Sequence, residues 1–183
     1  MQSLDVFTIN EESNCGENSL EFIWKAFSYF PDGLWHGINY LGNMNLKHDL
    51  GIKSEGKIYE AFIFSSLMIR IRREKDKLKN QGLLLAVTCD PVIAVYRRLE
   101  SGMFEEVINL IRDYVSNEVG VISLFKIEER TAPKIAAHGL GHNKGLSHHA
   151  EPVDLMYARL LDGHPIQKDG FCNKCRRKLK REM

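Results

Sequence analysis

The stretch AAHGLGHNKGLSHHAEPVDLMY, residues 136–157, decides how this 183-residue sequence is interpreted. His138 and His142 are four residues apart, so an α-helix would carry both imidazoles on one face, one turn apart. Gly145 can end that helix because glycine accepts a positive φ without steric cost, and His148 follows it three residues later. Three neutral imidazoles leave one position of a tetrahedral zinc ion open, as in catalytic zinc sites. We therefore predict that the three histidines bind Zn²⁺; the alternative is that they share this spacing by chance.

The composition is that of an ordinary globular protein, with 44% apolar residues, 27% charged residues and a formal net charge of +1. So small a net charge provides no strong field toward nucleic acid or membranes. Residues 172–183 hold six Lys or Arg against one Glu. Such a basic run either contacts phosphate or acidic partners or forms a solvated helix end. The N-terminus has no basic segment and no long apolar run, so we expect a cytoplasmic protein without a signal peptide or membrane span.

The four cysteines divide into two kinds. In a cytoplasmic chain the pair Cys172 and Cys175, with two residues between them, favours metal binding or redox chemistry over a structural disulfide. Cys15 and Cys89 are expected to be ordinary buried thiols.

Periodicity and turn residues predict the elements of one domain that mixes helices and strands. The expected strands are 4–9, 83–89, 92–96 and 119–127, and residues 35–46 leave room for one more. The expected helices are 18–30, 57–79 and 131–145, the last with Thr131 as its N-cap. Residues 104–115 carry apolar side chains at helical spacing. Strands followed by the histidine helix indicate an α+β or mixed α/β fold.

The histidine stretch resembles the metzincin signature of zinc peptidases, and Met156 stands where that signature continues into a Met-turn. It is most similar to the archaemetzincins, whose pattern adds a downstream Cys-x-x-Cys, present here as Cys172 and Cys175. The match is specific over residues 131–175 and looser upstream.

This resemblance implies an α+β fold, a compact mixed α/β domain in which a twisted sheet carries the active-site helix beside a cleft. It implies a catalytic-type domain over residues 1–148 and a small zinc-knuckle-like subdomain over 149–183. It also implies that 104–115 is partly strand, against its helical spacing, and that segment stays open. Met156 would form an apolar floor under the histidines. The strand expected at the cleft edge, where a peptide could pair, holds Val121, Ile122, Ser123 and Leu124.

Three positions depart from the family pattern. Gly139 stands where the family has the glutamate that moves protons between the zinc-bound water and the leaving amine. Losing a general base typically costs about 10²–10⁴-fold in rate, so hydrolysis should be weak or absent. His149 and Asp154 stand where the family has two cysteines. Both residue types ligate zinc, so a second, structural zinc site is possible, formed with the downstream pair Cys172 and Cys175; the alternative is an empty, reduced pair.

We therefore expect an archaemetzincin-like zinc metallopeptidase scaffold that acts on peptides or proteins as a monomer, with reduced or lost activity. The alternative is a non-catalytic, zinc-containing module that binds peptides. Nucleic-acid binding through the basic tail is disfavoured, because no aromatic residues are interleaved with its cations. One zinc ion is expected, and a second is left open.

Overall fold

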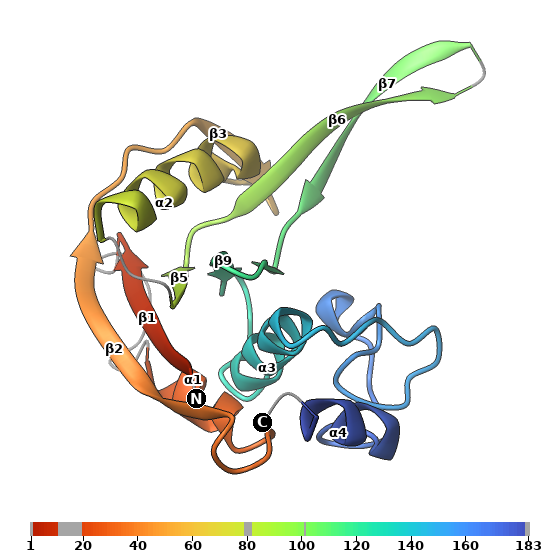
Figure 1. The fold of residues 1–183 in the computed structure, drawn as a ribbon. Coiled ribbons are helices and arrows are strands. Elements are labelled where there is room, and N and C mark those ends of the chain that lie inside the picture. Colours follow the sequence, from red (N-terminus) through yellow and green to blue (C-terminus); the bar gives the residue numbers. More distant parts are fainter. Residues whose placement is uncertain (1, 11–19, 79–81, 101, 182–183) are drawn as a thin grey trace.

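A computed structural model describes residues 2–10, 20–78, 82–100 and 102–181. Its centre is a five-stranded sheet in the order β2-β1-β5-β9-β8 (Figure 1). The first four of these strands pair in parallel, and the short β8 pairs antiparallel with β9 at the edge. In chain order they are β1 (Gln2–Ile9), β2 (Trp35–Met44), β5 (Leu83–Thr88), β8 (Asp113–Val115) and β9 (Val119–Ser123).

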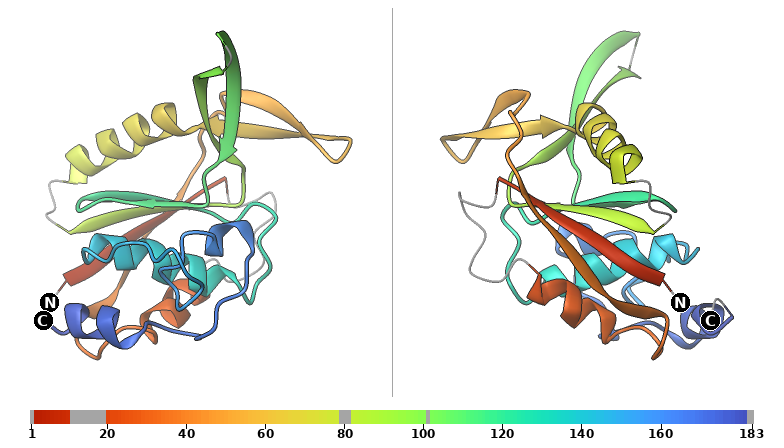
Figure 2. Two further views of the ribbon diagram at one scale, coloured as in Figure 1. Left: turned by 90° about the vertical axis from the view of Figure 1, so that its right-hand side faces the viewer. Right: turned by 60° about the vertical axis from the view of Figure 1, so that its left-hand side comes forward.

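Helices cover both faces of this sheet (Figure 2). The helix α2 (Phe64–Leu78) packs on one face, whereas α1 (Glu21–Phe27) and α3 (Ala132–Asn143) pack on the other. All six residues of β5 are buried, and its alternate side chains enter the two different cores. The predicted α+β fold is thereby confirmed.

A second sheet, in the order β3-β4-β6-β7, consists of two hairpins that extend away from the body (Figure 2). Its strands are β3 (Leu50–Ser54), β4 (Lys57–Ile63), β6 (Val92–Glu100) and β7 (Met103–Leu110). The chain ends in a short 3₁₀ turn, Leu160–Asp162, and the helix α4 (Asn173–Leu179). Phe171 and Leu179 enter the same core as α1 and α3, so the C-terminal segment packs directly beneath the histidine helix.

Several predicted elements are confirmed with shifted ends. The strands expected at 4–9, 83–89, 92–96 and 119–127 correspond to β1, β5, β6 and β9, and 35–46 contains β2. The helix expected at 131–145 is α3, and Gly145 ends it with a φ of 71°. Thr131 holds the N-cap position without a side-chain hydrogen bond. The helix expected at 18–30 is the shorter α1; residues 18 and 19 lie outside the described residues.

One predicted helix is wrong in its first part, and one segment that was left open consists mostly of strand. Residues 57–79 were expected to form one helix, but 57–63 form β4, which is paired with β3 through a turn at Glu55 and Gly56. Residues 104–115 lie in β7 and β8, as the family resemblance implied. In both places the pairing of strands decides the conformation. The spacing of apolar residues alone is compatible with either a helix or a strand there.

The prediction that Cys89 is an ordinary buried thiol is wrong, because this residue is only half-buried and is disulfide-bonded. The cytoplasmic location stays a prediction. Cys15 lies outside the described residues. Within the described ranges no helix is both long and apolar enough to cross a membrane. The predicted boundary at residue 148, between a catalytic-type domain and a C-terminal subdomain, likewise stays a prediction.

Candidate metal centre

The helix α3 and the turn after it bring together the three histidines of the signature. His138 and His142 lie one turn apart on α3, and their ring centroids are 4.7 Å apart. At the end of α3 the Gly145 N–H donates to the His142 carbonyl (2.8 Å) and the Leu146 N–H donates to the Gly141 carbonyl (2.9 Å). This C-terminal cap reverses the chain and returns His148 to the helix, with its ring 5.1 Å from that of His138.

The ring nitrogens of these three residues, hereafter the first cluster, converge on one point. One ligand nitrogen from each lies within 4.8 Å of the others. His142 Nε2 is 3.0 Å from His148 Nε2, against about 3.3–3.4 Å for two nitrogens on one tetrahedral zinc ion. His142 Nδ1 lies 3.0 Å from the Leu146 carbonyl. Because a carbonyl can only accept, Nδ1 carries the proton and Nε2 keeps its lone pair for a ligand.

His138 gives the strongest sign that the first cluster suits a metal ion. Its side chain is fully buried, yet neither ring nitrogen has a hydrogen-bond partner among the described residues. Buried polar groups almost always have a partner, and leaving one without a partner costs roughly 1–3 kcal/mol. A cation between the three imidazoles would satisfy the nitrogen that faces them.

Burial also keeps the cluster in the form that binds metal. Loss of hydration lowers the pKa of His142, and the nearby His138 lowers it further. The pKa of His148 is lowered by the same two causes and by His142. Neutral imidazoles are the ligands that zinc requires, so both residues are ready to bind it near neutral pH.

The space beside Gly139 is filled by the edge strand β8. A Cβ atom built on Gly139 would lie 2.8 Å from Val115 Cγ2 and 2.9 Å from Asp113 Oδ2. Contacts this short do not occur for real side chains, so α3 and β8 pack this closely only because residue 139 lacks a side chain. The position of the missing glutamate is therefore crowded by protein atoms.

The carboxylate of Asp113 lies beside the first cluster, next to the Nδ1 nitrogen of His138. Its side chain is 5% exposed, and Oδ2 lies 3.1 Å from His138 Nδ1. The two atoms are off the hydrogen-bond direction, and neither has a hydrogen-bond partner in the part of the chain that the structure describes. An imidazole points its two nitrogens in different directions, so an oxygen beside Nδ1 is remote from a metal on Nε2. Asp113 is thus placed to orient His138, as carboxylates behind zinc ligands do.

Gly141 has a packing role of its own. Its Cβ would meet Met156 Sδ at 2.8 Å, and Met156 is fully buried. The methionine predicted to lie under the histidines therefore packs against α3 two residues before its end. Both glycines of the histidine helix are explained by close neighbours.

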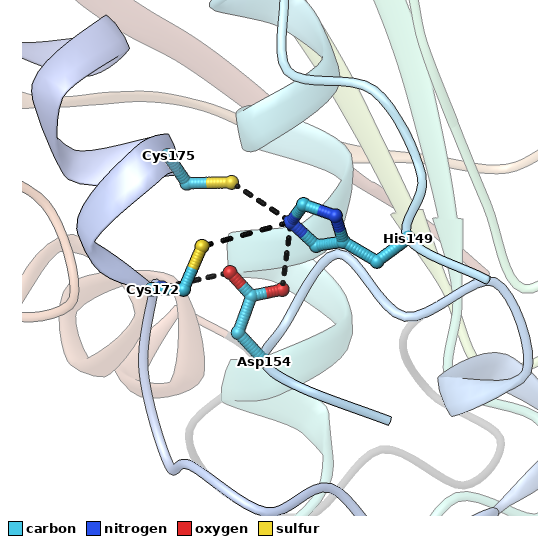
Figure 3. Close-up of side chains that lie close together, drawn as sticks. All are labelled: His149, Asp154, Cys172 and Cys175. Carbon is cyan, nitrogen blue, oxygen red and sulfur yellow. Dashed lines mark hydrogen bonds and ion pairs between the residues drawn. The ribbon is translucent and has the colours of Figure 1, made fainter. Parts of the chain in front are cut away.

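The second predicted ligand set also comes together (Figure 3). His149 Nε2 lies 3.2 Å from Cys175 Sγ, 3.7 Å from Cys172 Sγ and 3.5 Å from Asp154 Oδ1. These separations suit four ligands around one zinc ion. We call these four residues the second cluster. His148 and His149 are consecutive in extended chain, so their side chains point apart and serve different clusters.

Asp154 is held rigidly within the second cluster. Its Oδ2 accepts the Cys172 N–H (2.7 Å) and its Oδ1 accepts the Met156 N–H (2.8 Å). Burial raises the pKa of Asp154, but these hydrogen bonds and the contact with the Cys172 thiol outweigh burial, so the net shift is downward. Burial and then the negative charge of Asp154 raise the pKa of Cys175. A metal ion must therefore displace the Cys175 proton on binding.

The fold of the chain can be compared with solved structures. Archaemetzincin from Methanopyrus kandleri matches with a TM-score of 0.61 at 17% identity, covering 99% of this chain and 94% of that one. The chain has the fold of an archaemetzincin. A zinc-dependent peptidase from Methanocorpusculum labreanum matches with a TM-score of 0.57 at 17% identity, covering 96% and 99%. Metalloproteinase-II from Bacteroides fragilis matches with a TM-score of 0.54 at 12% identity, covering all of this chain and 53% of that one.

No protein-family model matches the sequence, and no curated protein does. The archaemetzincin fold is therefore reached through structure, and the sequence similarity that accompanies it is low. What the two clusters bind is a separate question, because a fold does not determine a function.

Within this archaemetzincin fold the predicted cleft-edge strand is wrong. The strand β9 lies inside the sheet, between β5 and β8. The Ser123 N–H donates to the Arg112 carbonyl, and the Leu124 N–H donates to Thr88 (both 2.8 Å). The backbone is thus already paired in the segment that holds Val121, Ile122, Ser123 and Leu124. The edge strand is β8, three residues long.

Sequence reasoning missed Asp113 and Val115, because the helical spacing of 104–115 concealed β8. One signal was available: edge strands are often very short and carry a charged residue, and Asp113 stands in such a short run just before the strand at 119–123.

Proposed function

We propose that this chain is a zinc-binding protein of metallopeptidase type that acts on peptides or proteins, with hydrolysis weak or absent. His138, His142 and His148 would hold the catalytic-type zinc, and Met156 would be the floor of the Met-turn. The observation that carries the proposal is the convergence of three imidazoles around a buried, unpartnered His138. The zinc-dependent peptidase with the same fold supports the choice of metal and of substrate class.

The chain's own residues would bind and orient a peptide at this centre. A bound zinc ion would polarise the carbonyl of a peptide bond and lower the pKa of a water molecule. The strand β8 pairs with β9 on one side only, so an extended peptide could add to its other side by backbone hydrogen bonds.

Among the described residues, neither Gly139 nor Asp113 can fill the proton-transfer role. A base must reach the proton it takes within about 2.6–3.2 Å. Gly139 has no side chain, and Asp113 lies against Nδ1 of His138. We infer that turnover falls about 10²–10⁴-fold relative to the same site with a base.

The second candidate function is a non-catalytic module that binds peptides without cutting them. The crowding of Gly139 by Val115 and Asp113 favours it, because the place of the base is closed as well as empty. The second cluster would be a structural zinc site in both cases.

A set of variants of the zinc-loaded protein tests both functions on unstructured reporter peptides. We expect negligible cleavage by the unmodified protein. Gly139→Glu alone should also be poor, because its Cβ meets Val115 at 2.8 Å. Gly139→Glu combined with Val115→Ala should gain zinc-dependent cleavage. The matched control is Gly139→Gln with Val115→Ala, which has the same shape and no base.

Each outcome decides between the two functions. Cleavage by the double Glu variant alone shows an intact peptidase centre that lacks one group. Peptide binding without cleavage in every variant supports the binding module. Vigorous zinc-dependent cleavage by the unmodified protein would refute the proposal of weak or absent hydrolysis.

A further inference from the structure

A basic cavity adjoins the first cluster. It has a volume of about 440 Å³, and its wall includes His148 of the first cluster together with His149 and Cys175 of the second. Among the described residues, no acidic one lines it. The cations that line it are Lys174, Arg177, Lys178 and Arg181.

These four cations share one side of the C-terminal helix. They are spaced by three, one and three residues, which places them along a single face of α4 and the residue pair that follows it. Leu179 points the other way and is fully buried in the core. The core thus fixes the direction in which the basic face points.

No carboxylate of the described residues forms an ion pair with the cations of the cavity. Lys178 Nζ donates to the Gly145 carbonyl, which is a neutral partner. Among the described residues, Lys174, Arg177 and Arg181 form no ion pair. Like charges gathered in one cavity repel each other and attract an anion, most strongly where protein walls exclude water.

The shape of the cavity indicates what kind of anion it takes. Its volume falls in the range of small-ligand pockets, and a group bound there would lie beside His148. A nucleic acid fits poorly, because its binding proteins contact many phosphates and stack bases on aromatic rings. No Phe, Tyr or Trp of the described residues lines this cavity. A carboxylate on a peptide fits the size, the charge and the position.

We propose that this basic cavity binds a carboxylate of the peptide ligand, so that the protein selects acidic peptides. The carboxylate belongs either to an Asp or Glu side chain or to the peptide's C-terminus. The inference rests on the proposed function, since it names the class of peptide that the same centre receives.

Fluorescence polarisation of dye-labelled, unstructured peptides with the zinc-loaded full chain tests this. The peptides are a Glu-containing one with an amidated C-terminus, its Gln counterpart, and the Gln peptide with a free C-terminus. The protein variants are Lys174→Gln with Arg177→Gln and, as a control of equal charge change, Arg72→Gln with Arg73→Gln on α2. All four replaced residues are exposed, so both variants should fold.

One or both carboxylate peptides should bind at least about tenfold more tightly than the neutral amidated peptide. The cavity variant should abolish most of that preference, the α2 control should keep it, and added salt should weaken it. The peptide that shows the preference identifies the source of the carboxylate.

Three results would overturn the inference: equal affinity for acidic and neutral peptides, a preference unchanged in the cavity variant, or a preference lost equally in the control. Tight binding of a single-stranded oligonucleotide without acidic preference would replace the peptide by nucleic acid. The two proposals fail separately. If neutral peptides bind in a zinc-dependent way without an acidic preference, the proposed function is supported and the carboxylate-binding cavity is not. If an acidic preference persists in the His148→Ala variant, the cavity is supported and the proposed function is not.

Discussion

The contact between Gly139 and β8 gives a prediction whose magnitude can be worked out. Gly139→Ala should gain about 1 kcal/mol from helix propensity. The new Cβ would lie 2.8 Å from Val115 Cγ2, and such overpacking costs about 1–3 kcal/mol. The free energy of unfolding should therefore fall by between about 0 and 2 kcal/mol. After Val115→Ala the crowding methyl is gone and the contact with Asp113 Oδ2 at 2.9 Å remains, so the same change should cost less than in the unmodified chain and should stabilise by at most about 1 kcal/mol.

A double-mutant cycle isolates this contact. Urea unfolding of the metal-free protein, followed by fluorescence of Trp24 and Trp35 and by circular dichroism, gives the four free energies. The predicted coupling between positions 139 and 115 is about 1–3 kcal/mol, with an unchanged dependence on urea. Gly37→Ala is the matched control, because its Cβ meets only Trp24 at 3.9 Å and should not couple to Val115.

A coupling below about 0.5 kcal/mol would contradict the reasoning, as would a Gly139→Ala variant that is more stable on its own. Either result would mean that β8 does not close the space beside Gly139. The place of the base would then be open, and Gly139→Glu alone should restore cleavage.

Three further predictions concern the metal clusters and their protonation. Asp113→Asn should weaken zinc binding at the first cluster by about 10–100-fold, because the carboxylate behind His138 is lost. Chelator competition measures this affinity, and the exposed control Glu118→Gln should leave it unchanged. Equal zinc affinities in the two variants would show that Asp113 does not orient His138. His149→Ala should lower the zinc content by about one ion per chain without altering chelator competition at the first cluster, whereas an unchanged content would show that the second cluster is empty. The metal-free protein should lose stability as the pH falls below about 6.5, because the lowered pKa values of His142 and His148 mean that the unfolded chain takes up protons first. That loss should be smaller in His142→Gln, and an equally steep loss in the variant would contradict it.

The sequence predicts the two clusters better than it predicts the sheet that supports them. A helical spacing of four and a glycine turn place His138, His142 and His148 by local geometry alone, so no distant contact is needed to foresee their meeting. The second cluster needed the family pattern, because Cys172 lies 23 residues beyond His149 and only the fold brings them together.

The errors arise where distant pairing decides the conformation. Residues 57–63 carry apolar spacing that suits a helix, yet Glu55 and Gly56 adopt φ values of 51° and 78° and turn the chain back onto β3. Glu55-Gly56 was the available signal, since two positive φ angles in sequence are typical of tight hairpins. Asp113 could not be foreseen as a neighbour of His138, because that contact depends on which strand lies at the sheet edge.

Gly139 has a chemical role that the sequence indicates and a packing role that only the structure shows. In the sequence it is only a missing glutamate inside a helix. In the structure it is also the point where α3 and β8 touch, so its replacement changes the packing as well as the chemistry.

The most direct test of the account is the zinc content of the purified protein beside that of a variant in which His138, His142 and His148 are all replaced by alanine. Metal analysis by mass spectrometry, with His149→Ala as the control for the second cluster, measures the ions per chain. The account predicts at least one zinc per chain in the unmodified protein and a loss of one ion in the triple variant. An unchanged zinc content in the triple variant would contradict it.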